Sequence, residues 1–194
     1  MNPLLRLAGL AAVLAASSAA AVEYNAVLLD KCQVTFTSRQ MNVPVDGLFK
    51  KFNAQVAFDP ARPEAGRAVV EIDLNSIDAG SDDANIEIKR KPWFDVQNFP
   101  TAKFVSTGVR TLGNGRYEAL GKMTIKGRTH DVVAPFTFKP AGSIGQFDGS
   151  FVVKRLQYAV GEGPWADTST VADEVVIKFR FLVAAAPPAA ADNK

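Results

Sequence analysis

This sequence has little of the side-chain chemistry that most enzymes use. Its 194 residues include a single histidine, His130, and a single cysteine, Cys32. One cysteine excludes an intramolecular disulfide, and one imidazole with one thiol supplies too few ligands for an ordinary zinc site. The 22 basic and 20 acidic residues nearly cancel, so the chain lacks the basic footprint of a nucleic-acid-binding protein. We therefore expect no metal, no catalytic cofactor and no nucleic-acid partner.

Long apolar runs are also absent, except near the N-terminus. Residues 1–7 carry one positive charge and no acid, residues 4–16 are apolar, and Ala19-Ala20-Ala21 fits the small-residue pattern that signal peptidase cuts. The run is shorter than the roughly 20 apolar residues that a membrane-spanning helix needs. We predict that residues 1–21 are a cleaved signal peptide and that the mature chain begins at Val22 and is exported.

The rest of the chain is long enough for one domain with a sizeable core. We assign residues 22–183 to this domain, and we expect Cys32 to be a small buried strand residue. Residues 184–194, with the sequence AAAPPAAADNK, have no side chains that can form a core, and we predict a disordered Pro/Ala tail.

Apolar and polar residues alternate with the period of two that indicates half-buried β-strands. The alternating stretches are residues 32–39, 51–59, 70–75, 102–109, 116–126, 132–138, 151–155 and 174–183. Connectors rich in Gly, Pro, Asn and Asp separate several of them, as expected where antiparallel strands reverse. Because amphipathic antiparallel strands avoid free edges by closing, we predict an all-β, eight-stranded antiparallel up-and-down barrel, lipocalin-like in form.

One segment departs from the alternation. The sequence from Ser81 begins with an N-cap residue followed by two aspartates, which favour the N-terminus of a helix, and Pro92 disfavours its continuation. We predict one short helix, about residues 82–90, between the third and fourth strands.

The sequence TIKGRTHDV, residues 124–132, contains His130 next to Asp131 and raises the possibility of acid–base catalysis. Such catalysis needs a third group within reach, and neighbouring residues of a strand point to opposite faces of the sheet. His130 and Asp131 are therefore not expected to act on one substrate together. We interpret this stretch as the hairpin between the fifth and sixth strands, with His130 as a turn residue or local hydrogen-bond partner.

Aromatic residues are strongly biased towards phenylalanine, with 13 Phe against 3 Tyr and 2 Trp. An eight-stranded barrel is either filled by side chains or holds one small ligand, and the sequence leaves both alternatives open. If the lumen is open, the residues expected to line it are Phe36, Phe52, Val56, Ile72, Phe94, Phe104, Met123, Ile125, Phe136, Phe138 and Phe151.

Three further residues are candidates for the mouth of the barrel. Arg155 is expected on the same, inward face of its strand as Phe151 and Val153. A charge there is costly unless it is paired or lies at the rim. We predict either a buried ion pair, for example with Asp173, or a contact with a ligand headgroup. Tyr158 and Trp165 belong to the same segment and have amphipathic rings suited to an entrance.

Four ordered motifs resemble those of the YceI-like family of exported, lipocalin-like proteins. They are VDGLFKKFNAQVAFDP (45–60), WFDVQNFPTAKFVST (93–107), YEALGKMTIKGRTHDVVAPFTF (117–138) and VKRLQYAVGEG (153–163). The resemblance extends from Tyr24 to about Val183. It implies an eight-stranded barrel in the periplasm whose lumen holds a polyisoprenoid, such as an isoprenoid quinone or a polyprenyl phosphate. It also implies a quinone-using membrane cytochrome as a partner.

We therefore expect a non-catalytic periplasmic carrier of a long-chain isoprenoid lipid, either a monomer or a homodimer. Two alternatives belong to other functional classes. One is an enzyme that acts on a lipid or quinone headgroup at the barrel mouth. The other is a filled barrel that serves as an interaction module.

The signal-peptide assignment predicts the N-terminus of the mature protein. When the full chain is expressed in a Gram-negative host, intact-mass analysis of the periplasmic fraction should give a protein that begins at Val22. A periplasmic product that retains residues 1–21 would contradict the assignment.

Overall fold

A computed structural model describes residues 22–186 of the chain. The predicted signal peptide and residues 187–194 of the predicted tail lie outside these residues. The last strand continues through Ala185, so the domain extends slightly further than the boundary predicted at residue 183.

The described chain is dominated by eleven antiparallel strands. Their bounds are β1 Tyr24–Val27, β2 Gln33–Gln40, β3 Val43–Phe49, β4 Phe52–Ala57, β5 Arg67–Asp73, β6 Ile77–Asp78, β7 Thr101–Gly113, β8 Arg116–Ile125, β9 Arg128–Ala141, β10 Ile144–Lys154 and β11 Glu174–Ala185. The helices are α1 Asp82–Glu87 and the 3-10 helices η1 Leu29–Lys31, η2 Pro63–Ala65, η3 Leu74–Ser76, η4 Arg155–Tyr158 and η5 Gly163–Ala166.

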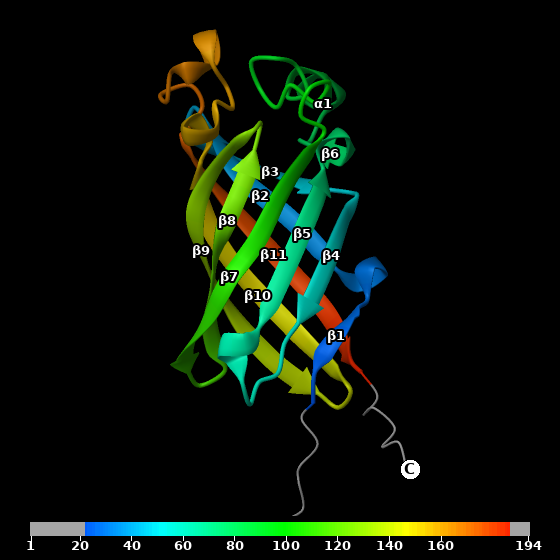
Figure 1. Ribbon diagram of the computed structural model, residues 1–194. Coiled ribbons are helices and arrows are strands. Elements are labelled where there is room, and N and C mark those ends of the chain that lie inside the picture. The colour runs from blue at the N-terminus through cyan, green and yellow to red at the C-terminus, as the bar shows by residue number, and fades with distance from the viewer. Residues whose placement is uncertain (1–21, 187–194) are drawn as a thin grey trace, which may run out of the picture.

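The strands form one curled sheet with the order β4-β5-β7-β8-β9-β10-β11-β2-β3-β6 (Figure 1). At the lower end in this view, β1 pairs with β11, and Tyr24 of β1 also bridges to Phe58, the residue that follows β4. There, the Tyr24 amide donates to the Phe58 carbonyl at 2.8 Å, and the Phe58 amide donates back at 3.1 Å. These bonds satisfy backbone groups that would otherwise be exposed at a sheet edge.

Each of the eight predicted strands is present, but the prediction of eight strands was wrong. Three strands were missed: β1 and β6 are short, and β3 contains Pro44 and Gly47, which obscure the alternation. The simple up-and-down ring was also wrong at one place, because β2 pairs with β3 and not with β4. The fold is a curled antiparallel sheet with one short helix.

The predicted helix is confirmed between β6 and β7 as α1, shorter than expected. The Ser81 hydroxyl accepts a hydrogen bond from the Ala84 amide, and Asp82 and Asp83 occupy the first turn, as the capping pattern predicted. The predicted hairpin is also confirmed: Ile125 pairs with Arg128 across a two-residue turn. Lys126 and Gly127 in that turn both have positive φ, which is the geometry of a tight β-hairpin.

An aromatic cluster fills the lower end of the sheet. Phe58 is 2 % exposed and makes edge-on contacts with four rings, at centroid distances of 5.0–6.0 Å. Those rings belong to Tyr117, Phe136, Phe138 and Phe147, and Tyr24 packs against the same group. Edge-to-face contacts are the favoured geometry for aromatic pairs. We refer to these six residues as the aromatic plug.

Truncation of the central ring of this plug should destabilise the protein strongly. Phe58→Ala is expected to lower the free energy of unfolding by about 3–5 kcal/mol, because it leaves a cavity that its neighbours cannot fill. Chemical denaturation measures the change. Leu112→Ala, at a side chain that is 47 % exposed, is the control and should change stability by less than about 0.5 kcal/mol. Similar losses in both variants would show that the plug is not a key part of the core.

Candidate functional site: an apolar cavity beneath a loop cap

A cavity of about 720 Å³ occupies the sheet interior above the aromatic plug. Residues from ten strands, β2 to β11, line it, together with α1 and the two segments that cover the upper end. The wall is almost wholly apolar. Its strand side chains include Val34, Phe36, Phe49, Val56, Val70, Ile72, Phe104, Met123, Ile125, Ala134, Phe151, Val153, Val175, Ile177, Phe179 and Phe181.

Glycine on neighbouring strands determines how several of these rings lie. Gly47 is paired directly with Phe36, and Gly149 is paired directly with Phe179. A Cβ at either glycine would collide with the ring opposite it, and a Cβ at Gly121 would likewise meet the Phe104 ring. Each of these three rings therefore lies over a glycine of the neighbouring strand. This arrangement keeps the wall apolar without filling the interior.

The predicted lining residues fall into two groups. Nine of the eleven candidates line the cavity: Phe36, Val56, Ile72, Phe94, Phe104, Met123, Ile125, Phe136 and Phe151. Phe138 does not, because it is 5 % exposed and packed within the aromatic plug. Phe52 also lies outside the lining and packs against Phe181 at a centroid distance of 6.0 Å. Strand parity predicts the face of a residue, but not its height along the lumen.

Sequence reasoning missed one important lining residue, Trp93. It lies in the connection between α1 and β7, is 9 % exposed, and is part of the cavity wall. A loop residue has no period-two pattern that predicts burial. The available signal was the unusual presence of an apolar Trp-Phe pair directly after a charged Lys-Arg-Lys-Pro segment.

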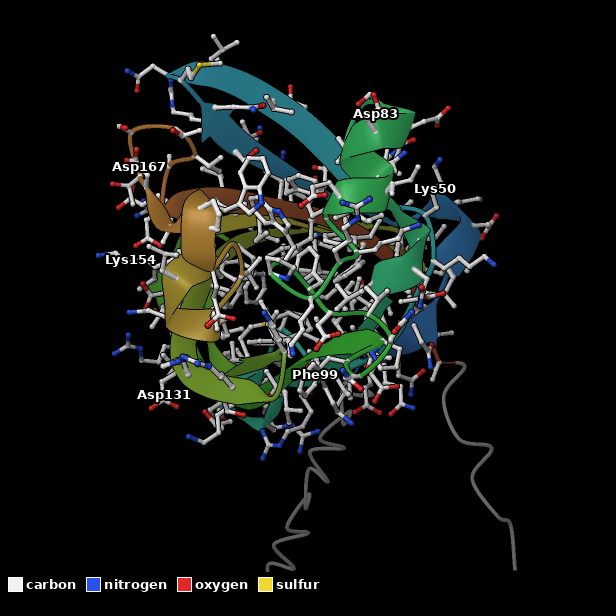
Figure 2. The ribbon with its side chains drawn as sticks, turned by 90° about the horizontal axis from the view of Figure 1, so that it is seen from above. Lys50, Asp83, Phe99, Asp131, Lys154 and Asp167 are labelled. Carbon is white, nitrogen blue, oxygen red and sulfur yellow. The ribbon has the colours of Figure 1, made fainter. Side chains whose placement is uncertain are left out.

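Two segments cover the upper end of the sheet, seen from above in Figure 2. One contains α1 and the loop that leads to β7, and the other is residues 155–173, which connect β10 to β11. Asp83 of the first segment and Asp167 of the second stand on different sides of the rim (Figure 2). We call these two segments the cap.

Arg155 organises the second of these segments. Its side chain is 4 % exposed, and all five of its N–H groups donate to backbone carbonyls. The acceptors are Ala172 (3.0 Å), Val160 (2.9 Å), Gly161 (2.9 Å), Trp165 (2.7 Å) and Val171 (2.7 Å). Burial lowers the pKa of Arg155 from its usual value, and the nearby Asp173 carboxylate opposes that effect.

This geometry changes the role predicted for Arg155. No N–H group of its guanidinium is free to bind a ligand headgroup. Its contacts are carbonyl oxygens, whereas the Asp173 carboxylate accepts from the Leu156 amide at 2.9 Å. Arg155 still contributes to the cavity wall, but its hydrogen bonds hold the cap.

Tyr158 and Trp165 also line the cavity at the cap. Tyr158 is 1 % exposed, and burial raises its pKa above the usual value. His130 contacts its ring edge-on at a centroid distance of 4.9 Å, and the His130 Nε2 atom lies 3.1 Å from the Gln157 carbonyl oxygen. Asp131 instead pairs with Lys122 at 2.8 Å on the outer surface. The two neighbours thus point to opposite faces, and His130 joins β9 to the cap.

Lys126 links the two halves of the cap. Its Nζ atom donates to the Lys91 carbonyl at 2.8 Å and to the Ala159 carbonyl at 2.7 Å, and it pairs with the Glu162 carboxylate at 3.0 Å. The hairpin tip between β8 and β9 is therefore tied to both cap segments.

Among residues 22–186, no group of three or more His, Cys, Asp or Glu side chains is arranged to hold a metal ion. In the same residues, no helix has the length and apolar character needed to cross a membrane.

Fold and cavity together define a calyx-like β-protein with an apolar interior site. Residues 26–183 match the YceI-like domain, and the chain belongs to that family. The crystal structure of Burkholderia cenocepacia BcnA has 46% sequence identity and a TM-score of 0.79, over 80% of this chain and 98% of that one.

Two further relatives extend the comparison. A polyisoprenoid binding domain from Saccharophagus degradans has the same fold, with a TM-score of 0.64 at 13% identity, over 86% of this chain and 99% of that one. A UPF0312 protein of Vibrio cholerae is 33% identical over 116 residues, which cover 58% of this chain. The chain matches 61% of that relative's length.

The Arg155 contacts predict a local loss of order when the guanidinium is removed. Arg155→Met should destabilise the protein by at least about 3 kcal/mol, because five carbonyl groups lose a charged donor. Hydrogen exchange should quicken in residues 155–173 more than in the strands. Arg180→Met, which removes a partly exposed pair with Asp148, is the control and should cost less than about 1 kcal/mol. Unchanged exchange in residues 155–173 of the Arg155 variant would contradict this role.

Proposed function

We propose that this protein binds and carries a long-chain isoprenoid lipid, either an isoprenoid quinone or a polyprenyl phosphate, in the periplasm. The observation that carries the proposal is the cavity of about 720 Å³ with its apolar wall. Cavities of about 300–1,000 Å³ are typical of sites for small organic ligands. An interior of this size with a mostly apolar wall is suited to a hydrocarbon chain.

The hydrophobic effect supplies enough free energy for such a ligand without specific polar contacts. Burial of apolar surface contributes about 25 cal/mol per Å², so a chain that buries several hundred Å² gains several kcal/mol. That gain offsets the loss of rotational freedom in a flexible tail. A branched isoprenoid chain also matches a wall of Phe, Val and Ile side chains with few polar atoms.

The comparisons support the same class of ligand. The Saccharophagus degradans protein is described as a polyisoprenoid binding domain, and it shares the fold of this chain. An export signal would place the carrier in the periplasm, where an apolar lipid needs protection from water. A quinone-using membrane cytochrome is the protein partner that this proposal suggests, with the carrier acting as a monomer or homodimer.

The two alternatives receive less support from the geometry. A filled interaction module does not account for the open volume above the aromatic plug. An enzyme at the mouth would draw on His130 and Arg155, yet both side chains contact cap carbonyls. We therefore favour a binding protein without catalytic activity.

Blocking the lumen should abolish binding while leaving the fold intact. Ala119 lies on the inner face of β8 and lines the cavity, so Ala119→Phe places a ring in the ligand's volume. We expect affinity for an isoprenoid quinone to fall at least about tenfold in a titration. The control is Val133→Phe on the neighbouring strand, at a residue that is 45 % exposed on the outer face.

The control variant should bind as the unaltered protein does, and both variants should retain the β-sheet circular-dichroism spectrum. Equal affinity of the two variants would place the ligand outside the cavity and contradict the proposal. Failure of the unaltered protein to bind any isoprenoid would contradict it as well.

A further inference from the structure

The indole of Trp93 occupies a distinctive position at the upper end of the cavity. Its ring forms part of the wall, and the Arg155 guanidinium carbon lies 5.6 Å from the ring centroid. The Trp165 ring lies beside it at a centroid distance of 5.4 Å and an interplanar angle of 49°. Trp93 therefore lies where the cap meets the apolar lumen.

The N–H group of this indole has no acceptor in the protein. Among the buried side-chain nitrogen and oxygen atoms of residues 22–186, Trp93 Nε1 is the one without a hydrogen-bond partner. A buried donor without an acceptor costs about 1–3 kcal/mol, so such groups are rare unless they serve a purpose.

Arg155 and Gly161 are neighbours of this indole. The Gly161 and Trp165 carbonyls accept hydrogen bonds from Arg155. The Cζ3 edge of the Trp93 ring faces Gly161. Because Nε1 lies on the opposite side of an indole from Cζ3, the N–H group is directed away from the Gly161 segment.

Charges near this end of the cavity disfavour an anionic headgroup. A buried anion needs a cationic partner, but the Arg155 guanidinium is saturated by five carbonyls. Lys126 is likewise bound by two carbonyls and a carboxylate. Two acidic residues of α1, Asp83 and Glu87, belong to the cavity wall at the same end. A neutral oxygen acceptor is therefore preferred to a phosphate.

We propose that Trp93 Nε1 donates a hydrogen bond to an uncharged oxygen of the ligand headgroup, such as a quinone carbonyl, and that this site selects neutral over phosphorylated isoprenoids. The inference rests on the proposed function, since the isoprenoid tail would occupy the lumen below. The headgroup then lies under the cap, and the tail extends towards the aromatic plug.

Three probes with the same short isoprenoid tail distinguish the contribution of the headgroup to binding affinity from that of the tail. They are a quinone, a monophosphate and a hydrocarbon that lacks a headgroup. The unaltered protein should bind the quinone about tenfold more tightly than the hydrocarbon, as expected for one well-formed hydrogen bond in a dry site. The monophosphate should bind no more tightly than the hydrocarbon.

Trp93→Phe keeps an aromatic ring and removes the donor. It should weaken quinone binding about tenfold, to the level of the hydrocarbon, while hydrocarbon binding stays within about twofold. Val133→Phe, at an exposed residue of β9 outside the cavity wall, is the control and should preserve the preference for the quinone. Thermal denaturation of both variants establishes that they remain folded.

A measurement on the unaltered protein provides a second test. The chain has two tryptophans, so the two indole N–H signals in a ¹⁵N-correlation spectrum are assigned by comparison with the Trp165→Phe variant. Quinone should shift the Trp93 signal downfield, whereas the hydrocarbon should not produce this shift.

Three results would overturn the inference. In the first, Trp93→Phe leaves the quinone preference unchanged although all probes bind, which removes the headgroup role but leaves the proposed function standing. In the second, the monophosphate binds more tightly than the quinone. In the third, the unaltered protein binds none of the probes, and the proposed function fails with the inference.

Discussion

The structure depends on an inner face of the sheet that apolar side chains cover while the cavity in front of it stays open. Phe36, Phe104 and Phe179 each lie over a glycine of a neighbouring strand, so their rings cover the wall and leave the centre open. At the lower end, the aromatic plug closes the interior with edge-to-face contacts. The same residue type thus closes the interior at its lower end and lines the open cavity above it.

The cap shows how a buried charge can order a loop. Arg155 has no carboxylate in hydrogen-bonding contact, and its charge is compensated by five carbonyl dipoles from residues 160–172. Lys126 makes the same kind of contact at the hairpin tip and joins the two cap segments. These cations are fully engaged by the protein, and the wall of the cavity below them is mostly apolar. Among the buried side-chain N and O atoms of residues 22–186, the Trp93 indole N–H is the one without a partner.

Much of this architecture could be predicted from the sequence, because period-two alternation directly reflects the two faces of a strand. It located eight strands, and the Lys126-Gly127 hairpin followed from turn chemistry. The same reasoning missed β3, where Pro44 and Gly47 interrupt the pattern, and it assigned Phe138 to the lumen although that ring belongs to the plug. It did not find the roles of Arg155 and Trp93, since the loop contacts that define them arise only when distant segments meet.

The central claim is that the cavity holds an isoprenoid lipid, and the most direct measurement is made on the protein as cells produce it. The full chain is expressed with its export signal, purified from the periplasm without detergent, extracted with organic solvent and analysed by mass spectrometry. We expect an isoprenoid lipid in near-stoichiometric amount, and a protein that takes up quinone after the lipid is removed. An extract without isoprenoid, from a protein that also fails to take up quinone, would contradict the claim.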